Sequence, residues 1–399
     1  MVRLPPRLRP MFPYLKPAYT QATRLVAPVT VRASQLRGGY LPTGMVATME
    51  DAAASTGGRC VVVRRPETLR RTIPRGVPDY PAAFEPECSE DVPRVAVAEL
   101  PHGRVLSPHN AVITGADDLL LEVSIYFGTR CAREHPIFLH PFPGLPLEVG
   151  GRLGVLALQG DANYYHFMMD VIPRLGVLEQ CPEIAPPELW HAPIRESFQR
   201  ELLELVGISP DRCVDSTQMR HVQAECLVVP SPPAMTVINP PWAVAYLRKR
   251  LLTTPIDRVP GRALYVNRGG GANNRQVTNE GELIDYLVGR GFRVIEPEKM
   301  SVVEKIWAFA EASVIVGAHS AGLVNLAFAS PGAAVIELFP AGGTNTCYWK
   351  LASAVPGLEY RYVCGRGDPG RLSLSEFLVS DIVADLDAVG AVLDELVRT

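Results

Sequence analysis

The chain has 399 residues, of which 47% are hydrophobic, so it is long enough for two packed domains with a core each. Its 42 acidic residues nearly balance its 39 basic residues. This balance leaves no broad positive field, which excludes a protein whose main partner is nucleic acid or an anionic membrane surface.

No segment of the sequence predicts secretion or membrane insertion. The arginine- and proline-rich residues 1–17 are not followed by an apolar stretch of signal-peptide length. No later run reaches the roughly eighteen apolar, charge-free residues of a membrane-spanning helix. We therefore expect a soluble, cytoplasmic protein without a transmembrane segment, which leaves peripheral membrane association open.

The cysteines predict neither a disulfide framework nor a metal site. There are eight of them, scattered without CxxC or CxxH spacing. We expect reduced, mostly buried thiols and no zinc or other metal.

The first half of the chain predicts a β-rich region followed by a strand, a loop and a helix. Residues 1–140 contain short strand-like runs, and no function is legible in them. Residues 155–158 predict a strand, and the apolar spacing over 164–178 predicts a helix. The proline- and serine-rich segment 230–241 predicts the linker between domains, with a helix from Trp242.

The second half alternates between β-rich and helical runs, which predicts an α/β fold with a parallel, doubly wound sheet. Asn279 with Glu282, and Ser301 with Glu304, predict capping boxes at two helix starts. An apolar stripe after Asp385 predicts an amphipathic last helix. The five predicted strands are residues 263–267, 292–295, 313–317, 334–338 and 360–364.

The end of the first of these strands predicts a diphosphate site. Ligands of open parallel sheets bind beyond the carboxyl ends of the strands. Arg268 follows the strand, a glycine-rich loop at 269–274 comes next, and Arg275 follows the loop. Glycines let the backbone approach a ligand, and guanidinium groups match phosphate oxygens. The alternative is an exposed turn with solvated arginines.

Two further strand ends carry candidate donor-binding residues. At the end of 313–317, small residues lead straight into a helix, whose free N–H groups attract anions. A carboxylate in strand 334–338 suits ribose hydroxyls. The alternatives are a tight turn capped by a serine and a glutamate facing water. The candidates are His319, Ser320, Ala321, Gly322 and Glu337.

The predicted helix over 164–178 carries polar residues among aromatic ones. His166 and Asp170 are four positions apart and share a face, so either could act as a general base. Asn163, Tyr165 and Arg174 are the other candidates for an acceptor cleft. The alternative is an ion network that holds a buried helix in place.

In three motifs the chain resembles glycosyltransferase family 61, which includes bacterial capsular-polysaccharide-type enzymes and eukaryotic xylosyl- and N-acetylglucosaminyltransferases. The motifs occur in the family's order and span residues 150–355. Ser320, where the family commonly has glycine, and the less basic 269–274 loop depart from its pattern. The motifs are residues 163–174, then 265–280 with Arg268 and Arg275, then 317–325 with Ile336 and Glu337.

This resemblance implies a GT-B fold, in which two Rossmann-like, doubly wound domains face a cleft. Residues 1–245 would form the acceptor-side domain, 246–375 the nucleotide-sugar-binding domain and 376–399 a terminal helix. It implies inverting transfer, without a cofactor or metal, from a nucleotide-diphosphate sugar to a glycan or other hydroxyl acceptor. Asp170 is the favoured base and His166 the second choice.

The resemblance also suggests surface-polysaccharide biosynthesis. Two alternatives on the same fold are a sugar-nucleotide epimerase or hydrolase, and a nucleotide-sugar-binding protein that catalyses nothing. Formation of an acceptor-dependent product distinguishes the transferase from both.

Overall fold

The computed structural model describes residues 12–124, 126, 131–140, 142–253, 262–269, 275–368 and 370–398. The chain forms two compact units, and neither is continuous in sequence. The first unit combines the chain up to Pro66 with Pro93–Ala234. The second combines Glu67–Val92 with the chain from Met235. No sequence pattern indicates the excursion Glu67–Val92, and the assignment of an acceptor side and a donor side stays a prediction.

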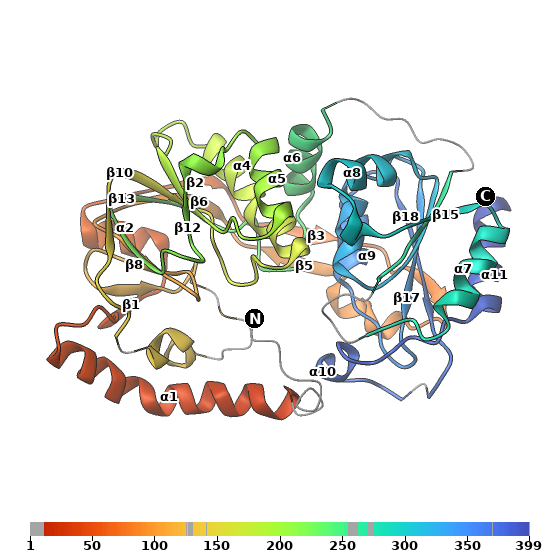
Figure 1. The fold of residues 1–399 in the computed structure, drawn as a ribbon, viewed down its shortest axis with the longest axis horizontal. Helices are drawn as coiled ribbons and strands as arrows, with labels where there is room; N and C mark the ends of the chain where they lie inside the picture. Colours follow the sequence, from red (N-terminus) through yellow and green to blue (C-terminus); the bar gives the residue numbers. More distant parts are fainter. Residues whose placement is uncertain are drawn as a thin grey trace. The chain divides into compact units, whose positions relative to one another are not determined.

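The first unit is built on a mixed sheet, whose described strands follow the order β1-β9-β8-β7-β13-β10-β11-β12, with β6 paired to β13 and β2 to β6 (Figure 1). β10 to β13 pair in parallel, whereas β6 and β7 pair antiparallel to β13. The strands are β1 Gly44–Val46, β2 Arg59–Arg64, β6 Val95–Pro101, β7 Arg104–Leu106, β8 Ala111–Ile113, β9 Asp118–Leu120, β10 Leu147–Val155, β11 Leu189–Ala192, β12 Cys213–Asp215 and β13 His221–Pro230.

The strand predicted at residues 155–158 is wrong, because β10 ends at Val155 instead of beginning there. The adjacent Gly150 and Gly151 of β10 interrupt the apolar pattern. Gly151 has a positive φ of 71°, and the pairing with β13 shifts register between Val149 and Arg152. Glycine at a bulge breaks the alternation by which strands are recognised.

The helix predicted over 164–178 is confirmed, with a change of winding in its middle. It comprises α3 Tyr164–His166, a π-helical turn η6 Phe167–Val171 and α4 Pro173–Glu179. Pro173 has no N–H group for the regular helical bond, and the wider turn accommodates it. The other helices of this unit are α1 Phe12–Leu36, α2 Met49–Thr56 and α5 Ser197–Leu205.

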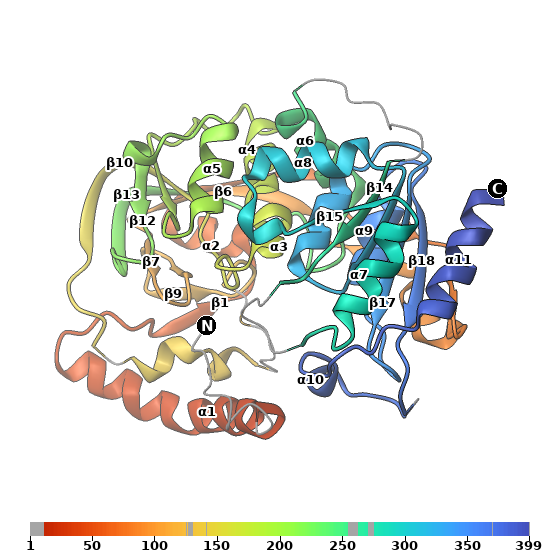
Figure 2. The same cartoon turned by 45° about the vertical axis from the view of Figure 1, so that its right-hand side comes forward.

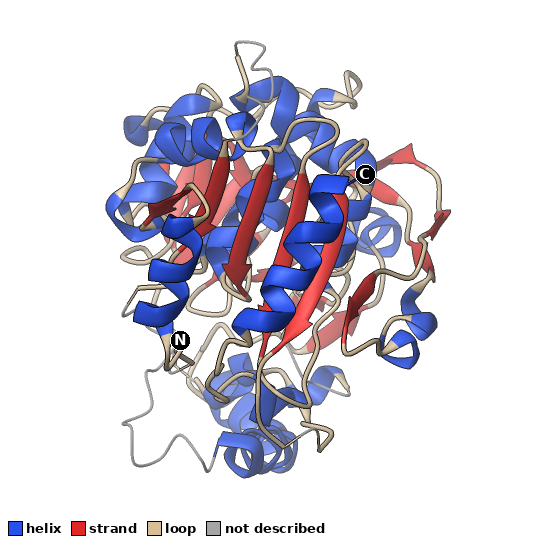
Figure 3. Cartoon of the chain, turned by 90° about the vertical axis from the view of Figure 1, so that its right-hand side faces the viewer, coloured by secondary structure: helices blue, strands red, loops and turns tan. Residues whose placement is uncertain are grey.

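The second unit contains the predicted parallel sheet (Figure 3). Its described strands have the order β15-β14-β16-β17-β18-β4. Five of them match the predicted strands within a residue or two, and β4, from the excursion, adds a parallel edge. The mixed α/β class is therefore confirmed. The strands are β14 Ala263–Val266, β15 Phe292–Ile295, β16 Val314–Ala318, β17 Ala334–Phe339, β18 Glu359–Cys364 and β4 Arg75–Val77, with β3 Glu67–Arg70 and β5 Ser89–Val92 forming a separate pair.

Helices cover both faces of this sheet. In Figures 1 and 2, α7 and α11 lie on one face and α8 and α9 on the other. Leu283 of α7 and Val389 of α11 join the same buried cluster as Val316 of β16. The helices are α6 Pro241–Leu251, α7 Glu280–Gly289, α8 Val302–Glu311, the 3₁₀ helix η9 Ala321–Phe328, α9 Cys347–Ser353, α10 Leu374–Phe377 and α11 Leu386–Arg398.

The predicted helix starts and the predicted last helix have mixed outcomes. The capping box of Ser301 and Glu304 is confirmed, as is the amphipathic helix α11. The box at Asn279 is wrong, since its side chain makes no cap. Asn279 instead bonds both the N–H and the carbonyl of Ala384, so a tertiary contact replaces the local one.

Candidate functional site

The connections of the second unit's sheet diverge between β14 and β16. The chain passes from β14 to β15 on one side and then returns to β16 on the other. At such a switch point the loops leave a crevice beyond the carboxyl ends of the strands, where ligands of this architecture bind. Arg268 follows β14 and His319 follows β16, so topology alone brings the first two predicted donor-binding segments together.

Both predicted arginines converge on one backbone atom. Arg268 donates from Nη1 to the carbonyl oxygen of His319 at 2.5 Å, and Arg275 donates to the same oxygen from Nη2 at 3.0 Å. A carbonyl has two lone pairs, so the two guanidinium groups saturate it. We call Arg268, Arg275, His319, Glu337 and the junction 320–322 the strand-end cluster.

The two arginines differ in how many guanidinium nitrogens a ligand could reach. Arg275 is only 3% exposed. It also donates to the carbonyl of Phe377 at 3.0 Å and lies over that residue's ring. Arg268 is half-buried, and its Nε and Nη2 are available to a ligand. Burial lowers the pKa of both, that of Arg275 to about 10 with help from the charge of Arg268, and both stay protonated.

Beneath the arginines lies a buried chain of three side chains. Nδ1 of His319 is 2.5 Å from Oε1 of Glu337, and the hydroxyl of Tyr360 donates to Oε2 of Glu337 at 2.5 Å. Burial raises the pKa of Glu337 to about 8. Burial, followed by the charges of Arg275 and Arg268, holds the pKa of His319 well below its ordinary value. The pair is therefore uncharged at neutral pH.

This protonation pattern fixes the histidine tautomer. Because Tyr360 already donates to one oxygen of Glu337, the carboxylic proton sits on the other oxygen and is donated to Nδ1 of His319. The imidazole then carries its own proton on Nε2 and acts there as a neutral donor.

The ribose-binding role expected for Glu337 does not suit this geometry. Its side chain is 0% exposed, and both of its oxygens are engaged by protein groups. It is suited instead to orient His319 from below.

The small-residue junction packs tightly against β14 and leaves helix N–H groups available. A Cβ on Gly317 would lie 2.9 Å from Leu323 and 3.1 Å from Val266. Ser320 precedes η9 without a side-chain cap, so the capped-turn alternative does not hold. Ser320, Ala321 and Gly322 are partly exposed, and the first N–H groups of a helix have no partner within it.

In the first unit, the candidate base lies on the π-helical turn that follows β10. Nδ1 of His166 is 2.8 Å from Oδ2 of Asp170, with the two side chains 19% and 10% exposed. Asn163 accepts from the N–H of Tyr165 at 2.9 Å and so starts the helix. Tyr165 is buried and meets His166 edge to face. We call this group the helix cluster.

Arg174, four positions after Asp170 on the same helix, is structural. It is 2% exposed and donates to the carbonyls of Pro230 and Leu156, at the carboxyl ends of β13 and β10. Burial lowers its pKa to about 9, against the attraction of Asp161 and Asp170. The predicted ion-network alternative therefore suits Arg174, while the side chain of His166 is 19% exposed and Asp170 is buried.

Three residues that lie beside these clusters were not singled out in the sequence. Tyr360 lies within a predicted strand, and Phe377 is distant in sequence, so neither carried a recognisable signal. Asp161 lies in the loop before α3, where its Oδ2 accepts from the N–H of Leu158 and from Asn110. Burial raises its pKa to about 7. A carboxyl group in a strand-to-helix loop was the available clue.

The described residues form neither a metal-binding cluster nor a membrane-spanning helix. Among them, no group of three or more His, Cys, Asp or Glu residues is placed to hold a metal ion. No described helix is long and apolar enough to cross a membrane.

One protein-family model covers residues of both clusters. Residues 164–336 match the protein-family model described as Glycosyltransferase 61. The chain carries a glycosyltransferase family 61 domain. The matched range contains His166, Asp170, Arg268, Arg275 and His319 and ends one residue before Glu337. The predicted family and the predicted enzyme class, a glycosyltransferase, are therefore confirmed for this domain.

Individual relatives of the family 61 domain are similar over a short segment. Protein O-linked-mannose beta-1,4-N-acetylglucosaminyltransferase 2 of Xenopus tropicalis is 32% identical over 96 residues, which are 23% of this chain and 16% of the relative. The protein of the same name from Danio rerio is 31% identical over 99 residues, 23% of this chain and 17% of the relative. The matched segment is thus about a sixth of each relative's length.

Proposed function

We propose that this chain is an inverting, metal-independent glycosyltransferase that moves a sugar from a nucleoside-diphosphate sugar to a hydroxyl group of a glycan or glycoconjugate. The observation that carries the proposal is the meeting of Arg268 and Arg275 at the carbonyl of His319, beside the junction 320–322. The proposed arrangement of the units is GT-B. A cytoplasmic location and a role in surface-polysaccharide biosynthesis stay predictions.

The donor's diphosphate would bind at the strand-end cluster. Arg268 supplies a charged fork, and the first N–H groups of η9 supply neutral donors. His319 adds its Nε2 proton, held in orientation by Glu337. These groups stabilise the charge that develops on the diphosphate as it leaves, which a metal ion does in other transferases.

The transfer itself needs one base. The acceptor oxygen attacks the anomeric carbon, the bond from that carbon to the diphosphate oxygen breaks, and the hydroxyl proton passes to the base. Asp170 is the proposed base, oriented by His166 at 2.8 Å. The proposed GT-B arrangement requires the helix cluster and the strand-end cluster to face one cleft.

A thermal-shift screen of the full chain against nucleotide sugars tests the donor class, because a ligand that binds the folded state raises its stability by mass action. We expect one nucleotide sugar to stabilise the wild type and to be consumed only when an acceptor is present. Consumption with equal rate in the absence of any acceptor would replace transfer by hydrolysis or epimerisation.

A further inference from the structure

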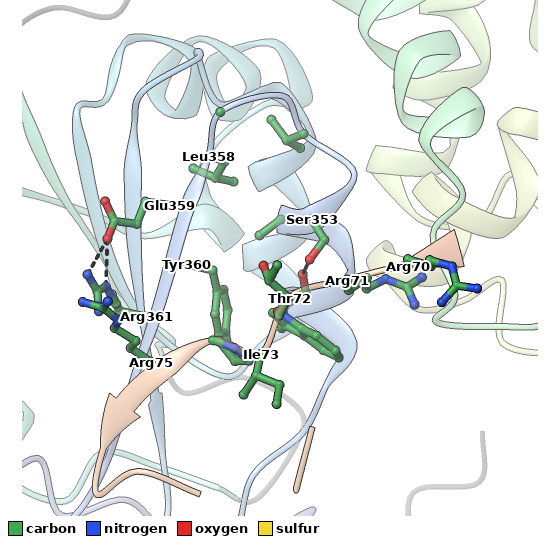
Figure 4. Close-up of a pocket in the computed structure, with 15 residues that line it drawn as sticks. Arg70, Arg71, Thr72, Ile73, Arg75, Ser353, Leu358, Glu359, Tyr360 and Arg361 are labelled. Carbon is green, nitrogen blue, oxygen red and sulfur yellow. Dashed lines mark hydrogen bonds and ion pairs between the residues drawn. The ribbon is translucent and has the colours of Figure 1, made fainter. Parts of the chain in front are cut away.

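A second recess of the second unit lies at the other edge of the same sheet. A cavity of about 600 Å³ opens where the chain from Arg70 to Arg75 passes the beginning of β18 (Figure 4). Its lining includes Glu359 and Arg361, at the amino-terminal end of β18, whereas the strand-end cluster lies at the carboxyl ends of β14 and β16. Because these strands are parallel, the cavity lies where the strands begin and the strand-end cluster lies where they end.

The cavity is rich in arginine. Four arginines line it against one acidic residue, Glu359. In Figure 4, Arg70 and Arg71 lie at one end of the cavity and Arg75 and Arg361 at the other. Such a lining concentrates positive potential in a recess of ligand size.

Two of these arginines are direct neighbours in the sheet. Arg75 of β4 and Arg361 of β18 are register partners, so their side chains leave the same face side by side. Like charges opposite each other on neighbouring strands are destabilising. Glu359 pairs with Arg361 at 2.6 Å. Glu395 of α11 is a second carboxylate, 3.9 Å from Nη1 of Arg361. In the described part of the chain, the side chain of Arg75 has no hydrogen bond or ion pair, so Arg75 is the arginine at this end without an acidic partner.

The opposite wall is held in place by its own contacts. Arg71 pairs with Glu90 at 3.0 Å and donates to the carbonyl of Ile238 at 2.8 Å. The indole N–H of Trp349 donates to the carbonyl of Thr72 at 3.1 Å. Arg71 is therefore structural. Arg70 is exposed beside it and, within the described residues, makes no side-chain hydrogen bond or ion pair.

We propose that this cavity binds a ligand that carries two oxyanion groups, phosphate or carboxylate. One group is bound by Arg75 and Arg361, and the other by Arg70 and the hydroxyl of Thr72. Guanidinium forks bind such groups in a bidentate way, and a bound anion relieves the repulsion between Arg75 and Arg361. This site does not depend on the proposed donor site, which uses other residues at the carboxyl ends of the strands.

Calorimetric titration of the full chain at low ionic strength tests the proposal, with pyrophosphate and trigalacturonate as separate probes. At least one probe should bind, and Arg75→Ala and Arg70→Ala should each raise its Kd by roughly tenfold or more, as expected for loss of a charge-assisted bond. Binding of pyrophosphate alone identifies a phosphate ligand, and binding of trigalacturonate alone identifies an acidic glycan.

Two control variants make the result specific. Arg293→Ala removes an exposed arginine from β15 of the same unit and should leave the Kd unchanged. Arg268→Ala removes any contribution of the donor site and should also leave this binding intact. Absence of binding by both probes, or an unchanged Kd in Arg75→Ala, would overturn the proposal. Binding of pyrophosphate that Arg268→Ala weakens and Arg75→Ala leaves unchanged would overturn it and support the donor site instead.

A stability measurement separates a ligand-binding arginine from a structural one. Arg75→Gln removes one of two like charges that face each other, so the free energy of unfolding at low salt should rise or stay the same. A clear loss of stability would mark Arg75 as a structural residue and contradict the proposal.

Discussion

Nδ1 of His319 and Oε1 of Glu337 are 2.5 Å apart in the interior of the second unit, and neither group is charged at neutral pH. In the folded protein the carboxyl group of Glu337 thus keeps its proton up to about pH 8, and His319 stays neutral. The carbonyl of the same histidine accepts from Arg268 and Arg275. The state of a buried pair and the position of the candidate donor-binding arginines are therefore linked through one residue.

The pair predicts a pH dependence of stability. Between pH 4.5 and 6.5 the unfolded chain holds one proton on this histidine and the folded chain one on Glu337, so the pair contributes no slope. From pH 6.5 to about 8 only the folded state holds a proton. Stability should therefore fall as the pH rises through this window, by at most about 1.4 kcal/mol per unit.

Glu337→Gln isolates this effect, because the amide has no proton to lose. Its free energy of unfolding, measured by urea denaturation, should lack the downward slope between pH 6.5 and about 8. Parallel curves for the two proteins in that window would show that Glu337 is already ionised in the fold.

Tyr360→Phe should lower the free energy of unfolding by about 1–3 kcal/mol, because it leaves a buried oxygen of Glu337 without its donor. Tyr286→Phe, which keeps a ring near Arg290 on the half-exposed side of α7, is the matched control and should change stability by less than about 0.5 kcal/mol. Urea denaturation at one pH compares the three proteins. Equal stability of Tyr360→Phe and wild type would refute the role given to this hydroxyl.

Arg268→Ala should mainly change donor affinity, and Arg275→Ala should mainly change stability. Loss of the half-buried Arg268 should weaken donor binding by roughly tenfold or more in calorimetry while stability changes little. Loss of the buried Arg275 should mainly lower stability, since two carbonyl contacts and the contact with Phe377 disappear together. The assignment fails if Arg268→Ala binds the donor as well as wild type does.

Asp170→Asn should reduce turnover by a factor of roughly 10² to 10⁴ and leave donor affinity nearly unchanged, because a base acts in the transition state. Asp211→Asn, an exposed carboxylate of the same unit, is the control. Rates from single-turnover assays decide the matter. Wild-type turnover in Asp170→Asn would move the base to His166 or to Asp161, whose pKa is raised to about 7.

Chelation should not abolish transfer. If Arg268 and the N–H groups of η9 stabilise the leaving diphosphate, activity in excess EDTA should stay within about twofold of the untreated rate. Restoration of a lost activity by added Mg²⁺ or Mn²⁺ would contradict metal-independent transfer.

Local sequence patterns predicted the strands and the helix that carry the two clusters. The strands around Val266 and Val316 have β-branched, apolar runs bounded by turns, and the helix that carries His166 and Asp170 keeps its spacing even through a π-helical turn. Because ligands of such sheets bind where strands end, these local patterns suffice to place both clusters at strand ends.

The sequence could not predict contacts made across long distances. The capping box at Asn279 failed because Ala384, 105 positions away, offers its side chain better partners. The burial of Arg275 and Glu337 could not be predicted for a related reason, since their partners Phe377 and Tyr360 depend on tertiary packing. The same holds for the pairing of Arg75 with Arg361, because β4 comes from a distant segment.

Hydrogen–deuterium exchange of the full chain, with and without the nucleotide sugar that gives the largest thermal shift, tests the central claim most directly. The account predicts slower amide exchange in peptides that cover residues 263–269 and 317–323, where Arg268 and the first N–H groups of η9 would hold the diphosphate. Unchanged exchange in both segments, with protection elsewhere in the chain, would contradict it.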